Sequence, residues 1–132
     1  MGRRATSFTG GVITSITDPL SRTWNLSYNG SEELATITYP ALGMTSYTTN
    51  LSYNGAHNIT DLQDRRGNHW TFGYSGNALT TETDPAGNVV GYSYGSGTTT
   101  ITDPNGHTTV EHFTSGKLTS VVDAASETES YT

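Results

Sequence analysis

One hairpin-like pattern recurs six times along this chain, and this repetition restricts the fold more than any other feature. Each copy follows L-x-x-I-x-D, with apolar residues five and two positions before the last site. A unit of about 20 residues cannot bury its apolar face alone, so neighbouring copies must pack side by side. The last site is occupied by Asp18, Tyr39, Asp64, Asp84, Asp103 and Asp123.

The apolar sites of the pattern are kept with few exceptions. The site five before the Asp is Ile13, Leu34, Ile59, Leu79, Thr98 and Leu118, and the site two before it is Ile16, Ile37, Leu62, Glu82, Ile101 and Val121. These two sites are three residues apart, so they point to opposite faces of a strand unless a bulge intervenes. The sequence leaves that question open.

A turn and a second strand follow each Asp. Turns such as "DPAG" and "DPNG" place Asp first, Pro second and Gly fourth, which suits a type I turn with Gly at positive φ. The second strand alternates, as in Trp24, Leu26 and Tyr28, so its large side chains share one face. Beyond it, Asn-Gly or Ser-Gly pairs favour a tight hairpin. We therefore predict an all-β fold of about 11 or 12 strands, in which antiparallel hairpin repeats form a single elongated, twisted or curled sheet.

This pattern covers almost the whole chain. We expect residues 1–10 to be a flexible N-terminal segment or a scar left by cloning, because two arginines without a following hydrophobic stretch do not make an intact signal peptide. Residues 11–132 are expected to form one repeat domain. Its predicted units are about 11–30, 31–55, 56–76, 77–97, 98–116 and 117–132.

The composition agrees with a thin core and excludes several classes of function. Hydrophobic residues make up 32%, against roughly 45–50% in a typical globular domain, whereas Thr (25) and Ser (14) are abundant. A net charge of −6 disfavours nucleic acid as a partner. Without Cys, disulfides and thiolate metal sites are excluded. No apolar run reaches the ~18 residues of a membrane span.

The stretches "LTTETDPAGNVVGYSYGSG" and "KLTSVVDAASETESY" resemble the YD (tyrosine-aspartate) repeats of RHS proteins. That family includes bacterial polymorphic toxins, insecticidal toxin complexes and animal teneurins, which are large secreted or surface proteins. The resemblance implies a β-sheet of the kind that spirals into a hollow shell in these relatives. At 132 residues this chain is too short to close such a shell, and its Tyr-Asp signature is degraded.

The family's C-terminal region can also hold an aspartyl self-cleavage site with two D-P-x-G motifs. Two such motifs occur here, Asp84-Pro85-Ala86-Gly87 and Asp103-Pro104-Asn105-Gly106. In a self-cleaving pair one Asp would need a raised pKa. The residues favour the simpler interpretation, in which both are turn residues one repeat apart.

Neither catalysis nor metal binding is indicated elsewhere. The four histidines lack the spacing to carboxylates that metal sites use, and no nucleophile elbow is present, so we predict no enzyme activity, cofactor or metal. The aromatic ladder is the candidate binding surface: it either packs strand on strand, which we favour, or forms a platform for sugar rings. Its residues are Trp24, Tyr28, Tyr53, Trp70, Phe72, Tyr74, Tyr92 and Tyr94.

These observations predict a non-catalytic structural repeat module, and the resemblance implies an extracellular or cell-surface location and a bacterial origin. A short strip of sheet has unpaired edges, so we expect a homo-oligomer or filament formed through the sheet edges or the aromatic face. The alternatives are a carbohydrate-binding or adhesion module that uses the aromatic face, and a remnant of the self-cleaving region.

Overall fold

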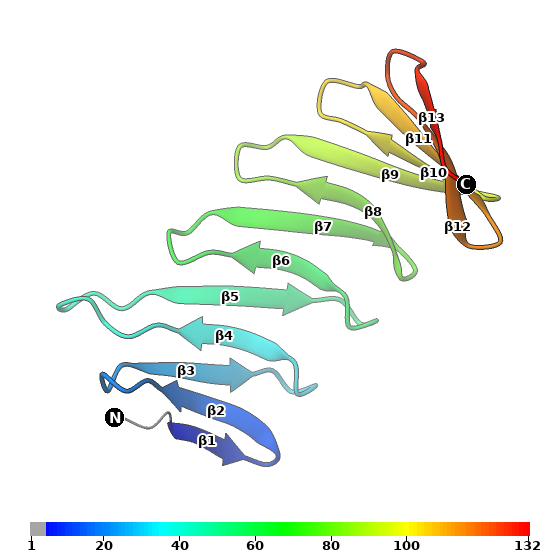
Figure 1. The fold of residues 1–132 in the computed structure, drawn as a ribbon. Coiled ribbons are helices and arrows are strands. Elements are labelled where there is room, and N and C mark those ends of the chain that lie inside the picture. The colour runs from blue at the N-terminus through cyan, green and yellow to red at the C-terminus, as the bar shows by residue number, and fades with distance from the viewer. Residues whose placement is uncertain (1–4) are drawn as a thin grey trace. The chain divides into compact units, whose positions relative to one another are not determined.

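The computed structural model describes residues 5–132, which form thirteen β-strands and no helix (Figure 1). The strands follow the order of the sequence in one sheet, and the printed pairs are antiparallel, which confirms the predicted all-β hairpin fold. The strands are β1 (Ala5–Thr9), β2 (Val12–Thr17), β3 (Thr23–Tyr28), β4 (Leu34–Thr38), β5 (Thr48–Tyr53), β6 (Ile59–Gln63), β7 (His69–Ser75), β8 (Ala78–Thr83), β9 (Val89–Gly95), β10 (Thr98–Thr102), β11 (Thr108–Thr114), β12 (Lys117–Val122) and β13 (Thr128–Ser130).

The chain contacts divide it into two compact units. The first unit ends at His69 and contains β1–β6, and the second runs from Trp70 to Thr132 and contains the rest of β7 and β8–β13. Part of the segment 1–10, expected to be flexible, is strand β1, which pairs with β2. Residues 1–4 lie outside the described residues. Across residues 5–132 there is no helix that could cross a membrane.

β-Bulges answer the question left open by the apolar sites. Between β3 and β4, Ser27 lies opposite Thr36 but Tyr28 lies opposite Leu34, so Ala35 is an extra residue on β4. The bulge turns the strand by one residue, which brings Leu34 onto the same face as Ile37. The same register shift occurs before the aromatic residue at Ser7/Phe8, Ser52/Tyr53, Gly73/Tyr74 and His112/Phe113.

The hairpin of β9 and β10 has no register shift. Tyr94 lies opposite Thr99, and Tyr92 lies opposite Ile101. The assignment of Thr98 to the first apolar site was therefore wrong by one residue. The physical reason is length: seven positions separate Tyr94 from Ile101, one fewer than separate Tyr74 from Glu82, so there is no residue to bulge out.

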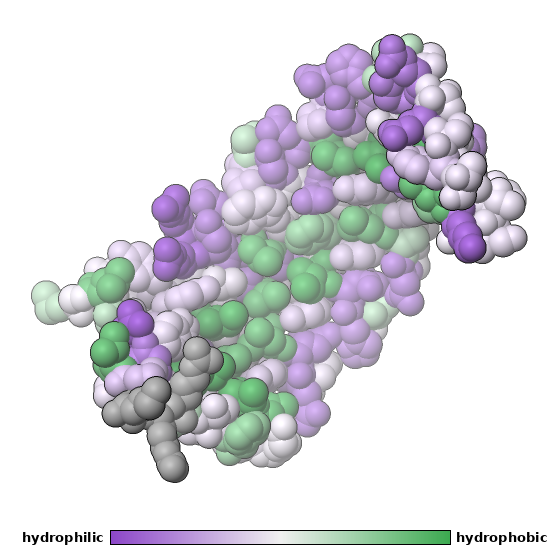
Figure 2. Space-filling model, viewed as in Figure 1, coloured by the Kyte–Doolittle hydropathy of each residue, from purple (hydrophilic) through white to green (hydrophobic). Residues whose placement is uncertain are grey.

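Large apolar side chains gather on one face of the sheet in each unit, which we call the apolar face (Figure 2). None of the described residues is fully buried, so this face is half-exposed and lacks a covering layer. In the first unit the apolar face comprises Phe8, Ile13, Ile16, Trp24, Leu26, Tyr28, Leu34, Ile37, Leu51, Tyr53, Ile59 and Leu62. In the second unit it comprises Trp70, Phe72, Tyr74, Leu79, Val90, Tyr92, Tyr94, Ile101, Phe113, Leu118 and Val121, together with Glu82, Glu111 and Glu129.

The Asp turns have the predicted geometry. Asp84 Oδ1 accepts the backbone N–H groups of Ala86 (2.8 Å) and Asn88 (2.9 Å), and the N–H of Gly87 donates to the Asp84 carbonyl (3.0 Å). Gly87 has φ 86°, the left-handed conformation that glycine adopts without strain. A type I turn followed by a left-handed residue gives a three-residue hairpin loop, which fixes the register of both strands.

The Asn-Gly turns form hairpins as predicted, but glycine is not their left-handed residue. Asn54 Oδ1 accepts the N–H groups of Ala56 and Asn58, as Asp does in the other turns. Positive φ falls on His57 (66°), two residues after Gly55. Asn therefore takes the role of the turn Asp at the opposite ends of the strands.

Candidate functional site

The aromatic ladder lies on the apolar face of its own unit and is only partly covered. Seven of its eight residues are half-buried, and Tyr94 is 53% exposed. A packed core would bury them, but the described strands form a single sheet in which no residue is fully buried. The packing role that we favour for these rings and the alternative, binding of sugar rings, both stay predictions.

Three tyrosine hydroxyls of the ladder donate hydrogen bonds to the backbone. The acceptors are carbonyls on the neighbouring strand: Tyr28 Oη donates to Ile13 (2.8 Å). Tyr53 and Tyr94 donate in the same way to Leu34 (2.9 Å) and Leu79 (2.8 Å). Each bond links the end of one strand to the start of the preceding strand. The acceptor carbonyl belongs in each case to the residue at the first apolar site of the repeat. Partial desolvation and the nearby Glu33 carboxylate raise the pKa of Tyr53 above its ordinary value.

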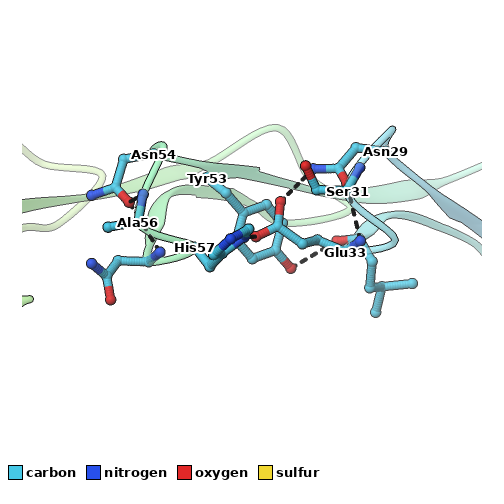
Figure 3. Close-up of polar contacts among 9 residues, drawn as sticks. Asn29, Ser31, Glu33, Tyr53, Asn54, Ala56 and His57 are labelled. Atoms are coloured by element: carbon cyan, nitrogen blue, oxygen red, sulfur yellow. Dashed lines mark hydrogen bonds and ion pairs between the residues drawn. The ribbon is translucent and has the colours of Figure 1, made fainter.

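A carboxylate bridges two successive Asn turns in the first unit (Figure 3). Glu33 accepts from Asn29 Nδ2 (2.6 Å) in its own turn and contacts His57 Nδ1 (2.8 Å) in the next. The hydrogen bond from Asn29 and the interaction with His57 lower the pKa of Glu33, against partial desolvation. Glu33 therefore links two successive Asn turns at the ends of their strands.

The loop of residues 39–47, between β4 and β5, extends beyond its neighbouring turns (Figure 1). Here Tyr39 replaces the turn Asp, and the loop closes on itself through mutual backbone hydrogen bonds between Leu42 and Thr45. The repeat pattern did not indicate a site at this place. The signals that could have found one are the lost Asp and the arginine pair in "DRRG".

Two adjoining hollows lie between this loop and the turns on either side of it. One has a volume of about 270 Å³ and is lined by Leu42, Tyr47, Arg65 and Arg66. The other, of about 150 Å³, is lined by Arg22, Trp24, Tyr39, Pro40, Leu42, Tyr47 and Arg65. We call the two together the arginine–aromatic pocket. Of the aromatic ladder, only Trp24 contributes to it.

Two arginines of this pocket lie over aromatic rings. The Arg22 guanidinium is 5.9 Å from the centre of the Trp24 ring, and that of Arg65 is 5.8 Å from the centre of the Tyr39 ring. Both distances are within cation–π range. Arg22 is also paired with Asp18 (Nη2–Oδ2 2.6 Å). The rings therefore orient the cationic groups that face the pocket.

Asp84 and Asp103, the candidate self-cleavage pair, occupy equivalent turns. Asp84 accepts from Asn88 Nδ2 (2.7 Å), and this bond with the backbone N–H bonds lowers its pKa. The backbone N–H and the side chain of His107 likewise lower the pKa of Asp103. A general acid would need the opposite shift. The arrangement favours the turn role for both.

Three of the four histidines make a side-chain contact with a nearby carboxylate. His57, His69 and His107 lie within 3.0 Å of one carboxylate oxygen each, on Glu33, Asp61 and Asp103. Within residues 5–132 there is no group of three or more His, Cys, Asp or Glu side chains placed to hold a metal ion. These pairs therefore serve the turns and strand ends.

The hairpin of turn Asp, alternating strand and terminal Tyr corresponds to a known repeat. Residues 53–89 match the family model described as RHS Repeat. This segment runs from Tyr53 through the Asp64 and Asp84 turns to the first residue of β9. No curated protein matches the chain. Residues 53–89 therefore carry an RHS repeat.

Proposed function

We propose that the chain is a non-catalytic structural module whose sheet is extended by strand addition at its edges, either within a longer RHS-type wall or between copies. The observation that carries this proposal is the absence of any fully buried residue among residues 5–132. A sheet with one half-exposed apolar face and no second layer is typical of a wall, and such faces mark surfaces that other protein covers.

The edge strands support this assignment. Among the described strands, β1 pairs with β2 alone and β13 with β12 alone, so both present backbone groups to a further strand. β1 reads ATSFT and carries no charge, whereas Glu127 and Glu129 lie beside or within β13. Two β13 edges would bring like charges together. We therefore expect copies to add β1 to β13 or β1 to β1.

RHS repeats typically occur in extracellular or surface proteins, and we propose a secreted or surface location in a bacterium, as a scaffold associated with a toxin. In that setting the apolar face would be covered by other parts of the shell or by a second copy. A bacterial origin and a toxin partner are tested by genetic context and fractionation, separately from the assembly experiment below.

Assembly is tested by light scattering on a sizing column over a range of concentrations, with negative-stain images of the largest fraction. We expect oligomers or filaments that grow with concentration. Phe8→Lys puts a charge on β1, where the native side chain is 64% exposed, and should reduce the assembled fraction. The control is Met44→Lys, in the 39–47 loop, which should assemble as the wild type does. A monomer at every concentration would refute assembly between copies.

A further inference from the structure

The Asn54–Gly55 turn of the first unit holds a side-chain amide that the proposed structural role does not use. Asn54 Oδ1 accepts the backbone N–H groups of Ala56 (2.9 Å) and Asn58 (3.1 Å) (Figure 3). We propose that this turn is a self-modifying site, at which Asn54 is converted by deamidation into an aspartate like those of the Asp turns. The reactants are the Asn54 side chain, the Gly55 backbone N–H and water.

The reaction needs no other reagent, and its atoms balance. The Gly55 nitrogen loses its proton to solvent and attacks Asn54 Cγ, and a cyclic succinimide forms when the Cγ–Nδ2 bond breaks. The leaving nitrogen takes up a proton and departs as ammonia. Water then opens the ring. Cleavage of the bond between Cγ and the Gly55 nitrogen leaves an ordinary Asp, whereas cleavage of the bond to the backbone carbonyl carbon leaves isoaspartate.

The backbone N–H groups at Asn54 Oδ1 are placed to accelerate the attack. As the Gly55 nitrogen bonds to Cγ, negative charge develops on Oδ1, the atom that already accepts both N–H groups. Donors at about 2.7–3.1 Å from a developing oxyanion form an oxyanion hole, in which one donor contributes a factor of roughly 10²–10³ to the rate of an enzyme. The turn therefore gives its own Asn a preorganised oxyanion hole.

The attacking nitrogen is also accessible. Within residues 5–132 the Gly55 N–H donates no hydrogen bond, and Gly55 is exposed. The Asn-Gly pair at 105–106 lacks both features of the Asn54 turn. The Gly106 N–H donates to the Asp103 carbonyl (3.0 Å), and in the described part of the chain Asn105 Oδ1 accepts no N–H group. Asn105 is therefore an internal reference for an Asn-Gly pair without this geometry.

The Asn29–Gly30 turn has the same oxyanion donors but holds the leaving group. Asn29 Oδ1 accepts the N–H groups of Ser31 (2.9 Å) and Glu33 (3.0 Å), while Asn29 Nδ2 donates to the Glu33 carboxylate (2.6 Å). The lowered pKa of Glu33 keeps this carboxylate ionised, so it cannot supply the proton that departing ammonia needs. Asn29 should therefore react more slowly than Asn54.

An aspartate suits the turn at position 54 but not at position 29. In the Asp64 turn, Oδ1 accepts the same set of N–H groups, and Asn68 Nδ2 donates to Oδ2 (2.9 Å). Asn58 stands in the equivalent place, four residues after Asn54. At Asn29, in contrast, the new carboxylate would replace the amide that donates to Glu33 and would repel it.

The test is incubation of the full chain at mildly alkaline pH, followed by peptide mapping with mass spectrometry and an isoaspartate assay. We expect Asn54 to be converted about tenfold or more faster than Asn105, with Asn29 between them. In urea, where the turns are lost, the three sites should react at similar rates. Gly55→Ala, whose Cβ meets no atom within 4 Å, hinders the nitrogen and should remove the advantage of Asn54.

The matched control is Gly30→Ala, which also meets no atom within 4 Å and should slow Asn29 alone. Equal rates at Asn54 and Asn105 in the folded chain, an advantage of Asn54 that persists in urea, or an unchanged rate in Gly55→Ala would overturn the proposal. Circular dichroism checks that each variant is folded. Assembly in light scattering is a separate readout, so failure of this site leaves the structural proposal standing.

A second measurement follows the product. Asn54→Asp should leave the urea midpoint of the first unit at or above that of the wild type, whereas Asn29→Asp should lower it. A greater loss in Asn54→Asp than in Asn29→Asp would contradict the conversion of Asn54 into a turn aspartate.

Discussion

The two units use the same hairpin but differ in what their apolar faces carry. Among residues 5–69 no charged residue occupies a strand position on this face, although the Arg22 guanidinium lies over the Trp24 ring. In the second, Glu82 lies opposite Phe72 and Val90, and Glu111 and Glu129 both lie opposite Val121. The repeat therefore tolerates a carboxylate at a site where the other copies have aliphatic side chains.

The second unit is also the more negatively charged of the two. Over residues 1–69 five arginines balance five carboxylates, whereas residues 70–132 hold seven carboxylates and one lysine, so the whole net charge of −6 belongs to the second unit. A half-exposed face explains the tolerance, because Glu82 keeps contact with water and accepts from Tyr92 Oη (3.4 Å). Desolvation and the Glu82 charge together raise the pKa of Tyr92.

What the units share is the polar framework of turns and tyrosine hydrogen bonds. Asp64 in the first unit and Asp84 in the second accept the same set of backbone N–H groups. Tyr53 and Tyr94 donate to equivalent carbonyls. The comparison indicates that the framework specifies the hairpin, while the apolar face sets how stable each unit is.

The largest expected effect comes from exchanging the residue two before the turn Asp. Leu62→Glu in the first unit should lower the free energy of unfolding by about 2 kcal/mol, because a charge replaces an aliphatic contact with Leu51. Glu82→Leu in the second should raise it by about 0.5–1 kcal/mol. Urea unfolding followed by Trp24 in a Trp70→Phe background, and by Trp70 in a Trp24→Phe background, reports each unit.

This exchange is a direct test of the comparison. If both substitutions change stability by the same amount and sign, the composition of the apolar face does not distinguish the units.

Acid should weaken both units, because both depend on ionised turn carboxylates. Hydrogen bonds from Asn68 and Asn88 hold the pKa of Asp64 and of Asp84 below the ordinary value. A lowered folded-state pKa contributes stability that is present above the unfolded-state pKa of about 3.9 and is lost as the pH falls through the folded-state pKa. The urea concentration at the midpoint of unfolding should be independent of pH near pH 6. It should decrease as the pH is lowered below about 4.

The matched variants for this effect are Asp64→Asn and Asp84→Asn. Asn keeps the Oδ1 acceptor, as Asn54 does in its own turn, but it does not titrate. Each variant should lower stability at pH 6 and flatten the acid slope of its own unit. An unchanged slope would mean that other carboxylates cause the acid response.

Much of this framework could be predicted from the sequence, and the exceptions have physical causes. The repeat period, the type I turns and the alternation of Trp24, Leu26 and Tyr28 follow from local rules, and the structure confirms them. The bulge after Leu34 could not be predicted, because it depends on pairing with a neighbouring strand. The misplaced Thr98 has another cause: the spacing between Tyr94 and Ile101 is one residue shorter than between Tyr74 and Glu82, and the repeat pattern was applied without allowing for it.

The arginine–aromatic pocket was missed for a related reason. Arg22, Tyr39 and Arg65 are far apart in the sequence. They come together because the three loops that carry them connect strands at the same end of the hairpins. Alternation predicts that the aromatic ladder shares a face, but it does not predict how far each ring is buried. Pattern therefore predicts the hairpin well and its surfaces poorly.

A smaller effect is expected when the tyrosine hydroxyls are removed. Tyr53→Phe leaves the Leu34 carbonyl without this donor and should cost about 1 kcal/mol, because Tyr53 is half-buried. Tyr94→Phe should cost less, since its side chain is 53% exposed and water can replace the bond. Urea unfolding of each unit measures both. A larger loss at Tyr94 than at Tyr53 would contradict the role assigned to burial.

The smallest expected effect concerns the left-handed turn residues, which should respond alike in both units. Glu32 (φ 61°) in the first and Ser126 (φ 65°) in the second adopt a conformation that costs a non-glycine residue roughly 1–2 kcal/mol. Glycine removes this strain but gains freedom in the unfolded chain, so Glu32→Gly and Ser126→Gly should each raise stability by about 0.5 kcal/mol. The control is Gly30→Ala, at a position without positive φ where an added Cβ meets no atom within 4 Å; it should be neutral or slightly stabilising. Equal gains in both units would show that these turns belong to the polar framework that the units share. A gain in one unit alone would show that the left-handed turns of the two units are stabilised differently.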